Sequence, residues 1–431
     1  MLFIALSLLT VVLLFRHRSV LAPSVFVGGF WSAYVLMTLI GFGWDSISIA
    51  ASVIVFLTLI MLALGDELGL QIEGDSKKNN VLTNWHAWQL LTIAAILGGI
   101  FHVFVVILFE GYSFSSLLTL DGLLEASHAM SWERYHGNYR SPFLAKISLP
   151  FVFIAPLLAG NLVGARGCHR RFWLFWALAW FLAPLGIAAI KTEKWPLICC
   201  VTFYVASFLS ARHVVNKEPV PVFRYGLISL SAFVSLSAVA LVSCVLRLGK
   251  WSVDAFYIGW DKVLSCIGSL VVFSKWLDLN SFDFPMNWGR STFAGCFHLL
   301  GIAERKQGLY GTFLELPNGE YSNVYTVLRP LLEDFTIIGA MLFIFFVGFS
   351  WRLGIRNRQL VVPAFAMSAS IIAINTSIFC HNSLPIAFVA FSGATFLCNS
   401  SLRNCALKSR NDFSQNIGRS NESHPDWQMD H

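Results

Sequence analysis

Side chains that can bind anions or move protons are concentrated in two polar segments of an otherwise apolar chain, residues 110–142 and 249–332. The longer segment contains Arg290 and His298, and Asp334 follows shortly after it. A guanidinium binds phosphate through two parallel hydrogen bonds, and an imidazole or a carboxylate can accept a proton from a hydroxyl group. The longer segment is therefore the first candidate for chemistry.

Further cations accompany Arg290 at positions that flank the apolar runs. They are Arg134, Lys191, Lys194, Arg305 and Arg329. Such groups at the rim of a membrane bundle suit a lipid-linked diphosphate, whose tail stays in the bilayer while its charged head reaches the surface. The alternative interpretation is that they are ordinary loop charges with no common ligand.

The composition is that of a membrane protein. Hydrophobic residues make up 56% of the chain and charged residues 13%, and the mean hydropathy is +0.66. These values lie outside the range of soluble globular proteins, and several apolar runs reach the ~17–25 residues that a helix needs to cross a bilayer. We therefore predict an all-α, polytopic membrane domain over residues 1–400, followed by a disordered cytoplasmic tail over 401–431.

Apolar runs between charged or turn-rich connectors predict about eleven transmembrane helices. They are expected near residues 2–15, 20–40, 47–65, 86–109, 143–163, 172–190, 196–210, 225–247, 333–350, 360–380 and 385–400.

Basic residues predict the orientation of these helices. If Arg16 and Arg18 lie in the cytoplasm, alternation places every strongly basic short connector but one on that same side, as the positive-inside rule requires. Residues 110–142 and 249–332 then become extracytoplasmic loops. The exception is the connector with Lys191 and Lys194, which is either a functional site or a pair of lysines reaching the interface.

The longer loop begins with an apolar stretch, Trp251–Trp276, that charged residues interrupt. Its uninterrupted part is too short to span a bilayer, so we expect an amphipathic helix lying in the interface. Cys266 and Cys296 both lie in this loop and could pair in an oxidising compartment.

The sequence gives little support for a metal, a cofactor or nucleic acid as a ligand. The nine cysteines show no metal-ligand spacing, so neither a metal nor a cofactor is expected. The net charge of +6 is spread over the connectors rather than gathered in a patch, which argues against nucleic acid as a partner.

Three short motifs resemble those of bacterial oligosaccharide repeat-unit polymerases, the O-antigen polymerases of the Wzy type. Arg290 and Gly301 fit an Arg-x10-Gly pattern of that family's large periplasmic loop. Asn323 and Tyr325 are similar to its Asn-x-Tyr segment, which leads into Asp334-Phe335 and Gly339 at the next helix. The string Glu133-Arg134-Tyr135 looks like the Arg-Tyr element of the earlier loop.

The resemblance implies a metal-independent glycosyltransferase of the bacterial inner membrane. It would join undecaprenyl-diphosphate-linked oligosaccharides on the periplasmic face into a surface polysaccharide such as O-antigen, with a chain-length regulator as a further partner. Arg290, then Arg134, would bind the diphosphate, with Lys191 and Arg329 in support. His298 is favoured as the proton acceptor over Asp334 and Glu333, and Asn323 and Tyr325 would contact the glycan.

Two positions depart from the family's pattern. Ser322 stands where relatives often have histidine, and Thr336 stands where the helix start often has glycine. The alternatives are an O-antigen ligase, which would be expected to carry that histidine, a polysaccharide transporter and an O-acyltransferase. A transporter would favour charges within the spans, of which the sequence shows almost none.

Overall fold

The protein is a predominantly helical membrane protein in its computed structural model. The structure describes residues 1–72, 85–135, 142–166, 175–216 except 177, 238, 241–303 except 250, 281, 283 and 285, 310–379 except 378, and 383–398. In these ranges the elements are α1 (Leu2–His17), α2 (Pro23–Phe42), α3 (Ile49–Gln71), α4 (Trp85–Phe109), α5 (Phe114–Leu117), α6 (Leu120–Tyr135), α7 (Phe143–Arg166), η1 (Ala179–Phe181), α9 (Leu182–Ile190), α10 (Lys194–Ala211), η2 (Arg212–Asn216), α12 (Val253–Ile267), α13 (Ser269–Asn280), α14 (Ala294–Leu299), β1 (Leu314–Glu315), β2 (Tyr321–Ser322), α15 (Leu328–Arg356) and α16 (Val361–Ile372). A further apolar helix covers Ser383–Cys398.

Six of the described helices are long and apolar enough to cross a membrane. They are Pro23–Phe42, Ile49–Gln71, Trp85–Phe109, Phe143–Ala165, Lys194–Val215 and Leu328–Arg356. This confirms the helical membrane class, whereas the described residues do not show eleven spans. Four of the expected spans appear as shorter apolar helices, Leu2–His17, Ala179–Ile190, Val361–Ile372 and Ser383–Cys398. Most of the expected span at 225–247, and the tail at 401–431, lie outside the described residues.

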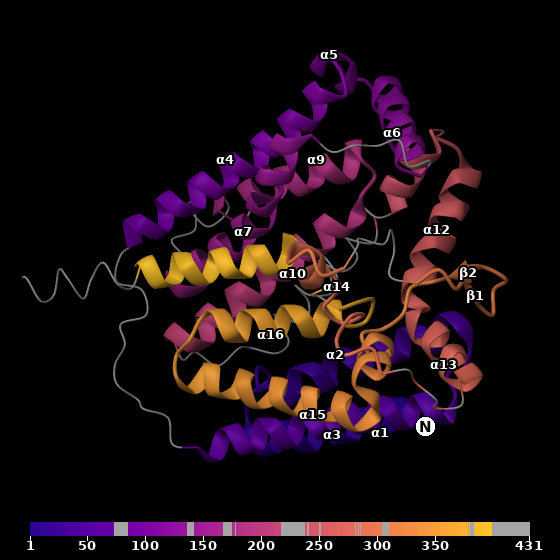
Figure 1. Ribbon diagram of the computed structural model, residues 1–431, viewed down its shortest axis with the longest axis vertical. Coiled ribbons are helices and arrows are strands. Elements are labelled where there is room, and N and C mark those ends of the chain that lie inside the picture. The colour runs from indigo at the N-terminus through magenta and orange to yellow at the C-terminus, as the bar shows by residue number, and fades with distance from the viewer. Residues whose placement is uncertain are drawn as a thin grey trace, which may run out of the picture.

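The helices pack into two groups that share α10 and α16. One apolar core joins α1, α2, α3, α13 and α15, and the other joins α4, α7, α9, α10 and the helix Ser383–Cys398. Figure 1 shows these two groups as a lower and an upper layer, with α16 between them. The loop elements α12, α13, β1 and β2 lie together at one end of the layers.

Glycines allow the closest helix contacts. A Cβ on Gly348 of α15 would lie 2.4 Å from the Leu62 carbonyl oxygen of α3, and one on Gly160 of α7 would lie 2.4 Å from the Tyr204 carbonyl oxygen of α10. Because lipid offers no hydrophobic drive for helix association, such backbone approach supplies the van der Waals contact that holds membrane helices together.

Proline in α7 creates a polar contact in the second group. Pro156 has no N–H to donate to the Val152 carbonyl oxygen one turn earlier. The Cys200 thiol of α10 donates to that oxygen instead, at 3.3 Å. The Val152 carbonyl oxygen, to which lipid could donate no hydrogen bond, thereby has a partner.

The expected interfacial helix at Trp251–Trp276 is two helices. Gly268 follows α12, and Val253–Ser265 and Ser269–Asn280 meet at a bend of 54°. Four side chains of α13, Leu270, Val271, Val272 and Phe273, are fully buried in the first core. An amphipathic pattern alone did not predict this burial, because α13 packs against α2 and α3 from elsewhere in the sequence.

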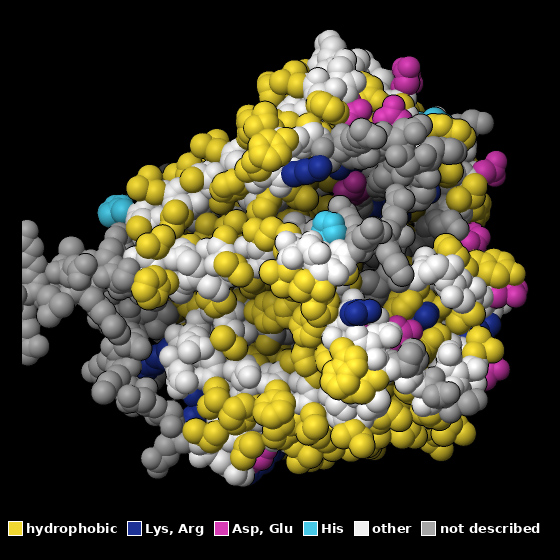
Figure 2. Space-filling model, viewed as in Figure 1, with side chains coloured by type: hydrophobic (Ala, Val, Ile, Leu, Met, Phe, Trp, Pro, Cys, Tyr) yellow, Lys and Arg dark blue, Asp and Glu magenta, His cyan; other side chains and the backbone are white. Residues whose placement is uncertain are grey.

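Large apolar side chains also cover the outside of the helices. Leu8, Val12, Ile40 and Leu97 are each at least 60% exposed. Figure 2 shows hydrophobic side chains spread over much of one face. Contact with lipid accounts for such a surface, because the exposure of so much apolar area to water would be unfavourable.

Candidate substrate-binding site

The turn that carries Arg290 is fixed to the first turns of α15. The Asp334 carboxylate is fully buried and accepts hydrogen bonds from the backbone N–H groups of Ser291, at 3.1 Å, and Thr292, at 2.5 Å. The Asn287 N–H donates to the Glu333 carbonyl oxygen at 2.9 Å. The Ser377 hydroxyl donates to the Thr292 carbonyl oxygen, also at 2.9 Å. Four hydrogen bonds thus hold residues 287–292, which we call the arginine turn, against α15 and the segment after α16.

The Asp334 carboxylate was predicted to be a possible proton acceptor. Its burial and its two backbone donors fit a positioning role instead, because a fully buried carboxylate that already accepts two N–H groups is closed to a substrate hydroxyl. Asp334 and Arg290 are therefore brought together, as the motifs suggested, but through the backbone of the arginine turn.

A break in α15 follows the two acidic residues. Thr336 has φ 60° and ψ −177°, a conformation that belongs almost entirely to glycine. A Cβ on Gly339 would lie 2.8 Å from the Phe335 Cβ, so the chain after the break leaves no room for a side chain at that position. The Asp-Phe-Thr-x-x-Gly pattern is thus explained by backbone geometry, and Thr336 occupies the position where glycine is the better residue.

Arg290 itself faces solvent. Its side chain is exposed and has no hydrogen-bond or ionic partner among the residues that the structure describes. The preceding residues, Trp288 and Gly289, both have positive φ, 52° and 85°. Trp288 is 71% exposed, while Gly289 is buried near the Phe293 and Phe335 rings. The arginine turn therefore presents a tryptophan and an arginine outward from a buried glycine.

His298 lies on the short helix that follows this turn. Its side chain is half-buried on α14, which ends where Gly301 adopts φ 70°. The Gly301 N–H donates to the His298 carbonyl oxygen at 3.1 Å, and the Ile302 N–H donates to the Phe297 carbonyl oxygen at 2.9 Å. Gly301 is consequently a helix terminator, which is the physical reason for glycine at the end of the Arg-x10-Gly pattern. Cys296 on the same helix is a free thiol, and the side chain of Cys266, its suggested disulfide partner, lies outside the described residues.

Arg329 is enclosed rather than free for a diphosphate. Its Nε atom donates to Glu333 Oε1 at 2.8 Å, and its guanidinium carbon lies 3.6 Å from the Tyr310 ring centre and 4.0 Å from that of Tyr325. Trp276 of α13 is a third neighbouring ring, at 4.9 Å. The arginine side chain is only 8% exposed. Ion pairing and cation–π contact explain how this charge tolerates burial, and they assign Arg329 a structural role.

Asn323 and Tyr325 hold the loop in front of Arg329. The Asn323 side-chain amide donates to the Tyr310 carbonyl oxygen at 2.9 Å, and the Tyr325 hydroxyl donates to the Thr312 carbonyl oxygen at 3.1 Å. Burial, first of all, raises the pKa of Tyr325, while Arg329 opposes that rise. The Asn-x-Tyr motif therefore fixes the segment 310–313. Tyr310 of that segment, Tyr325 and Trp276 form an aromatic cage around Arg329.

Lys191 and Arg134, two further predicted cations, lie after α9 and on α6. Lys191 follows α9 and forms an ion pair with Glu193 at 3.1 Å. Ile190, directly before it, packs with Val106 of α4 and Met130 of α6. Arg134 is on the last turn of α6, and its side chain lies outside the described part, as does Arg305. A common cation cluster around Arg290 thus remains a prediction.

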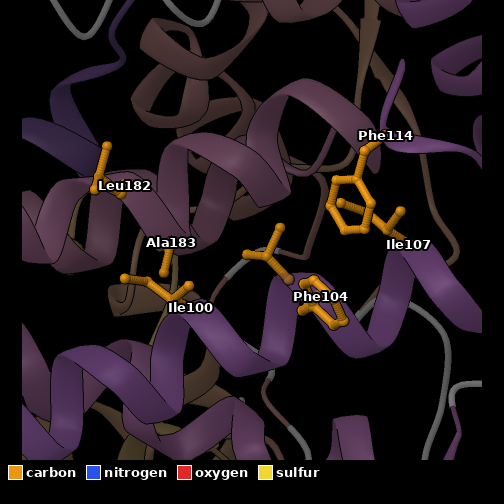
Figure 3. A pocket seen from close by; sticks show the side chains of 7 residues that line it. Ile100, Phe104, Ile107, Phe114, Leu182 and Ala183 are labelled. Carbon is orange, nitrogen blue, oxygen red and sulfur yellow. The ribbon is translucent and has the colours of Figure 1, made fainter. Parts of the chain in front are cut away.

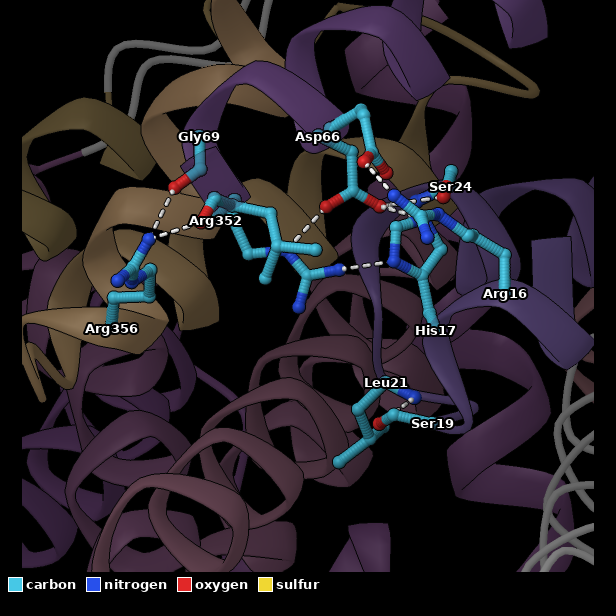
Figure 4. Close-up of polar contacts among 11 residues, drawn as sticks. Arg16, His17, Ser19, Leu21, Ser24, Asp66, Gly69, Arg352 and Arg356 are labelled. Atoms are coloured by element: carbon cyan, nitrogen blue, oxygen red, sulfur yellow. Dashed lines mark hydrogen bonds and ion pairs between the residues drawn. The ribbon is translucent and has the colours of Figure 1, made fainter. Parts of the chain in front are cut away.

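A buried charged cluster that the sequence did not predict ties α1, α2, α3 and α15 together (Figure 4). Asp66 is fully buried and accepts from Arg352 Nε, at 2.5 Å, and from the Ser24 hydroxyl, at 2.5 Å. His17 Nε2 lies 3.6 Å from the same carboxylate. The predicted span ended at residue 65, one position too early to include Asp66. The signal was available in Gly65-Asp66-Glu67-Leu68-Gly69, since small residues four apart predict the helix contact that buries the acid between them.

One cavity, of about 170 Å³, lies between α4, α5 and α9. Its lining is apolar throughout and includes Phe104, Phe114 and Leu182 (Figure 3). A cavity without a polar group can hold a hydrocarbon but cannot orient a reacting substrate. The arginine turn is accordingly the stronger candidate site.

No known family model matches this chain, and neither does any curated protein or solved structure. The functional argument therefore depends on the site and on the motifs that meet there.

Proposed function

We propose that the protein polymerises lipid-linked oligosaccharide repeat units into a surface polysaccharide. It would act on undecaprenyl-diphosphate-linked glycans at the periplasmic face of a bacterial inner membrane, with about eleven spans and a cytoplasmic C-terminus. The observation that carries the proposal is the convergence of two of the three motifs on Glu333 and Asp334. The Arg290 segment reaches Asp334, and the Asn323–Tyr325 segment reaches Arg329 and Glu333 through Tyr310.

The proposed reaction is a glycosyl transfer without a metal. A hydroxyl oxygen of the incoming repeat unit attacks the anomeric carbon of the growing chain, and the bond from that carbon to the diphosphate oxygen breaks. The diphosphate leaves with the electron pair, and Arg290 stabilises its developing charge. The hydroxyl proton passes to a base, for which His298, on the helix that follows the arginine turn, is the candidate.

Electrostatics favour Arg290 for the anion-binding role over the neighbouring charges. Glu333 is neutralised by Arg329 and also accepts from the Tyr310 hydroxyl at 3.0 Å, and Asp334 is occupied by two N–H groups. The exposed guanidinium of Arg290 thus keeps its charge for a ligand. Arg134 and Lys191 are proposed to approach the same diphosphate, with Asn323 and Tyr325 shaping the glycan side.

Deletion of the gene in its host, followed by gel analysis of the surface glycan, tests the proposal. A polymerase deletion leaves single repeat units attached where a ladder was present. Loss of all attached glycan, with polymer still on its lipid carrier, would identify a ligase instead. An unchanged ladder would contradict both activities.

Complementation of that deletion tests the site. Arg290→Ala should fail to restore the ladder, while Arg290→Lys should restore short chains, because a point charge replaces bidentate binding only in part. Arg358→Ala, just beyond the C-terminal end of α15, is the matched control and should restore the ladder fully. Normal chain lengths from Arg290→Ala at equal protein levels would remove Arg290 from the mechanism.

A further inference from the structure

The arginine turn pairs an exposed aromatic face with an exposed cation. Gly289 is buried against the Phe293 side chain, where an added Cβ would lie 3.1 Å from a ring carbon. The side chains on either side of it are both exposed, Trp288 by 71%. Burial of the middle residue therefore directs its two neighbours away from the core.

The conformation of Trp288 is costly and is held in place. A bulky residue at φ 52° is an outlier that persists only where the surroundings impose it. Here the Asn287 N–H is bound to α15, the Arg290 N–H donates to the Asn287 carbonyl oxygen at 3.2 Å, and Asp334 binds the next two N–H groups. The turn is thus rigid before any ligand arrives, which lowers the entropy that binding must overcome.

The chemistry of this pair matches one ligand class. An indole offers a flat apolar surface with little conformational freedom, and it packs well against the C–H face of a pyranose ring. The guanidinium beside it binds phosphate oxygens. In a glycosyl phosphate the ring and the phosphate are joined through one oxygen, so an aromatic face and a cation two residues apart can contact both at once.

We propose that Trp288 stacks on the sugar ring bonded directly to the diphosphate while Arg290 binds the phosphate. The arginine turn then recognises a glycosyl diphosphate as a unit, and Trp288 contributes the part of affinity that depends on the sugar. This inference rests on the proposed function and extends it to a specific residue and a specific sugar of the lipid-linked substrate.

A membrane anchor is the competing explanation for an exposed tryptophan. An anchor needs neither a strained backbone nor an adjacent exposed cation, whereas Trp288 has a positive φ and the neighbouring Arg290 is exposed with no ionic partner in the described part of the chain. Trp44, which is 70% exposed in the turn between α2 and α3, provides a matched control for anchoring.

The test compares two probes on the full chain in lipid nanodiscs, by calorimetry or thermophoresis. One probe is farnesyl diphosphate, and the other is its glycosyl ester, made separately with N-acetylglucosamine and with galactose. For the wild-type protein we expect at least one glycosyl ester to bind more tightly than farnesyl diphosphate. Trp288→Ala should abolish that gain, a loss of about three- to tenfold for one aromatic contact, and leave farnesyl diphosphate binding unchanged. Trp288→Phe should keep part of the gain.

Two comparisons make the outcome decisive. Arg290→Ala should weaken all probes together, and Trp44→Ala should weaken none. The inference alone is overturned if the wild type binds farnesyl diphosphate but the sugar adds nothing, or if the sugar-dependent gain survives Trp288→Ala. It is likewise overturned if Trp288→Ala and Trp44→Ala lower stability in nanodiscs equally without changing the gain. If the wild type binds no probe at all, the proposed function fails and the inference fails with it.

Discussion

The Asp334 carboxylate binds the backbone of Ser291, with 3.1 Å between the acceptor oxygen and the N–H nitrogen, and thereby joins the arginine turn to the start of α15. A second N–H group, that of Thr292, completes the contact. The residue that the motifs suggest for acid–base chemistry is thus the one that positions the turn with the exposed arginine.

Asp334→Ala should release the arginine turn. The substitution leaves two backbone donors without an acceptor, and each such group costs about 1–3 kcal/mol when buried. Hydrogen exchange should therefore quicken at Ser291 and Thr292, while Asp334→Asn, which keeps one acceptor oxygen, should give an intermediate effect. Asp278→Ala, at an exposed position of α13, is the control. Unchanged exchange at both amides in Asp334→Ala would refute the anchoring role.

Thr336→Gly should stabilise the protein. Backbone strain at Thr336 destabilises the folded state by about 1–3 kcal/mol. Glycine removes this strain, but its greater freedom in the unfolded chain lowers the stability by roughly 0.5–1 kcal/mol. The expected net gain is about 1 kcal/mol, measurable as a higher Tm in detergent. Thr58→Gly, in the regular helix α3, should lower Tm instead. Equal losses from both variants would mean that Thr336 is unstrained.

Substitutions of Arg329 and Glu333 should have strongly non-additive effects on the free energy of unfolding. Arg329→Met removes the partner of a carboxylate whose side chain is 11% exposed, and loss of one member of a buried pair costs about 3–5 kcal/mol. The double variant Arg329→Met/Glu333→Gln should recover a large part of that loss, because no charge is then left unpaired. Unfolding titrations of the single and double variants give the coupling energy, and additive losses would argue against the pair.

Tyr325 should make the loop over Arg329 sensitive to alkaline pH. Burial raises the pKa of Tyr325 above its ordinary value of 10.0, and the neutral hydroxyl is needed to donate to Thr312. A raised pKa in the folded state contributes stability that is present below pH 10 and is lost as the pH rises through the folded pKa. Limited proteolysis across segment 310–325 should therefore quicken at high pH in the wild type. Tyr325→Phe should cleave faster at neutral pH and lose the pH dependence, and an unchanged pH profile in that variant would assign the transition elsewhere.

Gly348→Ala should separate α15 from α3. The added Cβ would lie 2.4 Å from the Leu62 carbonyl oxygen, a distance that only backbone movement can relieve. Gly29→Ala is the matched control, since its Cβ would meet only the Thr10 side chain at 4.0 Å. We expect a lower Tm for the first and an unchanged or higher Tm for the second, because alanine favours the helix where space allows. Equal Tm values for Gly348→Ala and the wild type would show that the two helices are less tightly packed.

The lengths of the apolar runs and the residue types in the polar segments predicted much of the helical framework and part of the site. The apolar runs at 20–40, 47–65, 86–109, 143–163 and 196–210 correspond to long helices, because enough consecutive apolar side chains favour a spanning helix whatever surrounds them. Arg290 was identified from its residue type in a polar segment. The bend between α12 and α13 and the burial of α13 were missed, because both depend on packing against α2 and α3.

The amino-acid sequence by itself determines that this chain is helical and membrane-embedded, since composition and the length of apolar runs set that outcome locally. It also determines which residue types are available around Arg290. Only the tertiary structure decides what each does: Asp334 holds a turn, Arg329 fills an aromatic cage, and Arg290 and Trp288 face outward. Those roles depend on partners such as Ser291, Tyr310 and Ser377, which approach only after distant helices have packed.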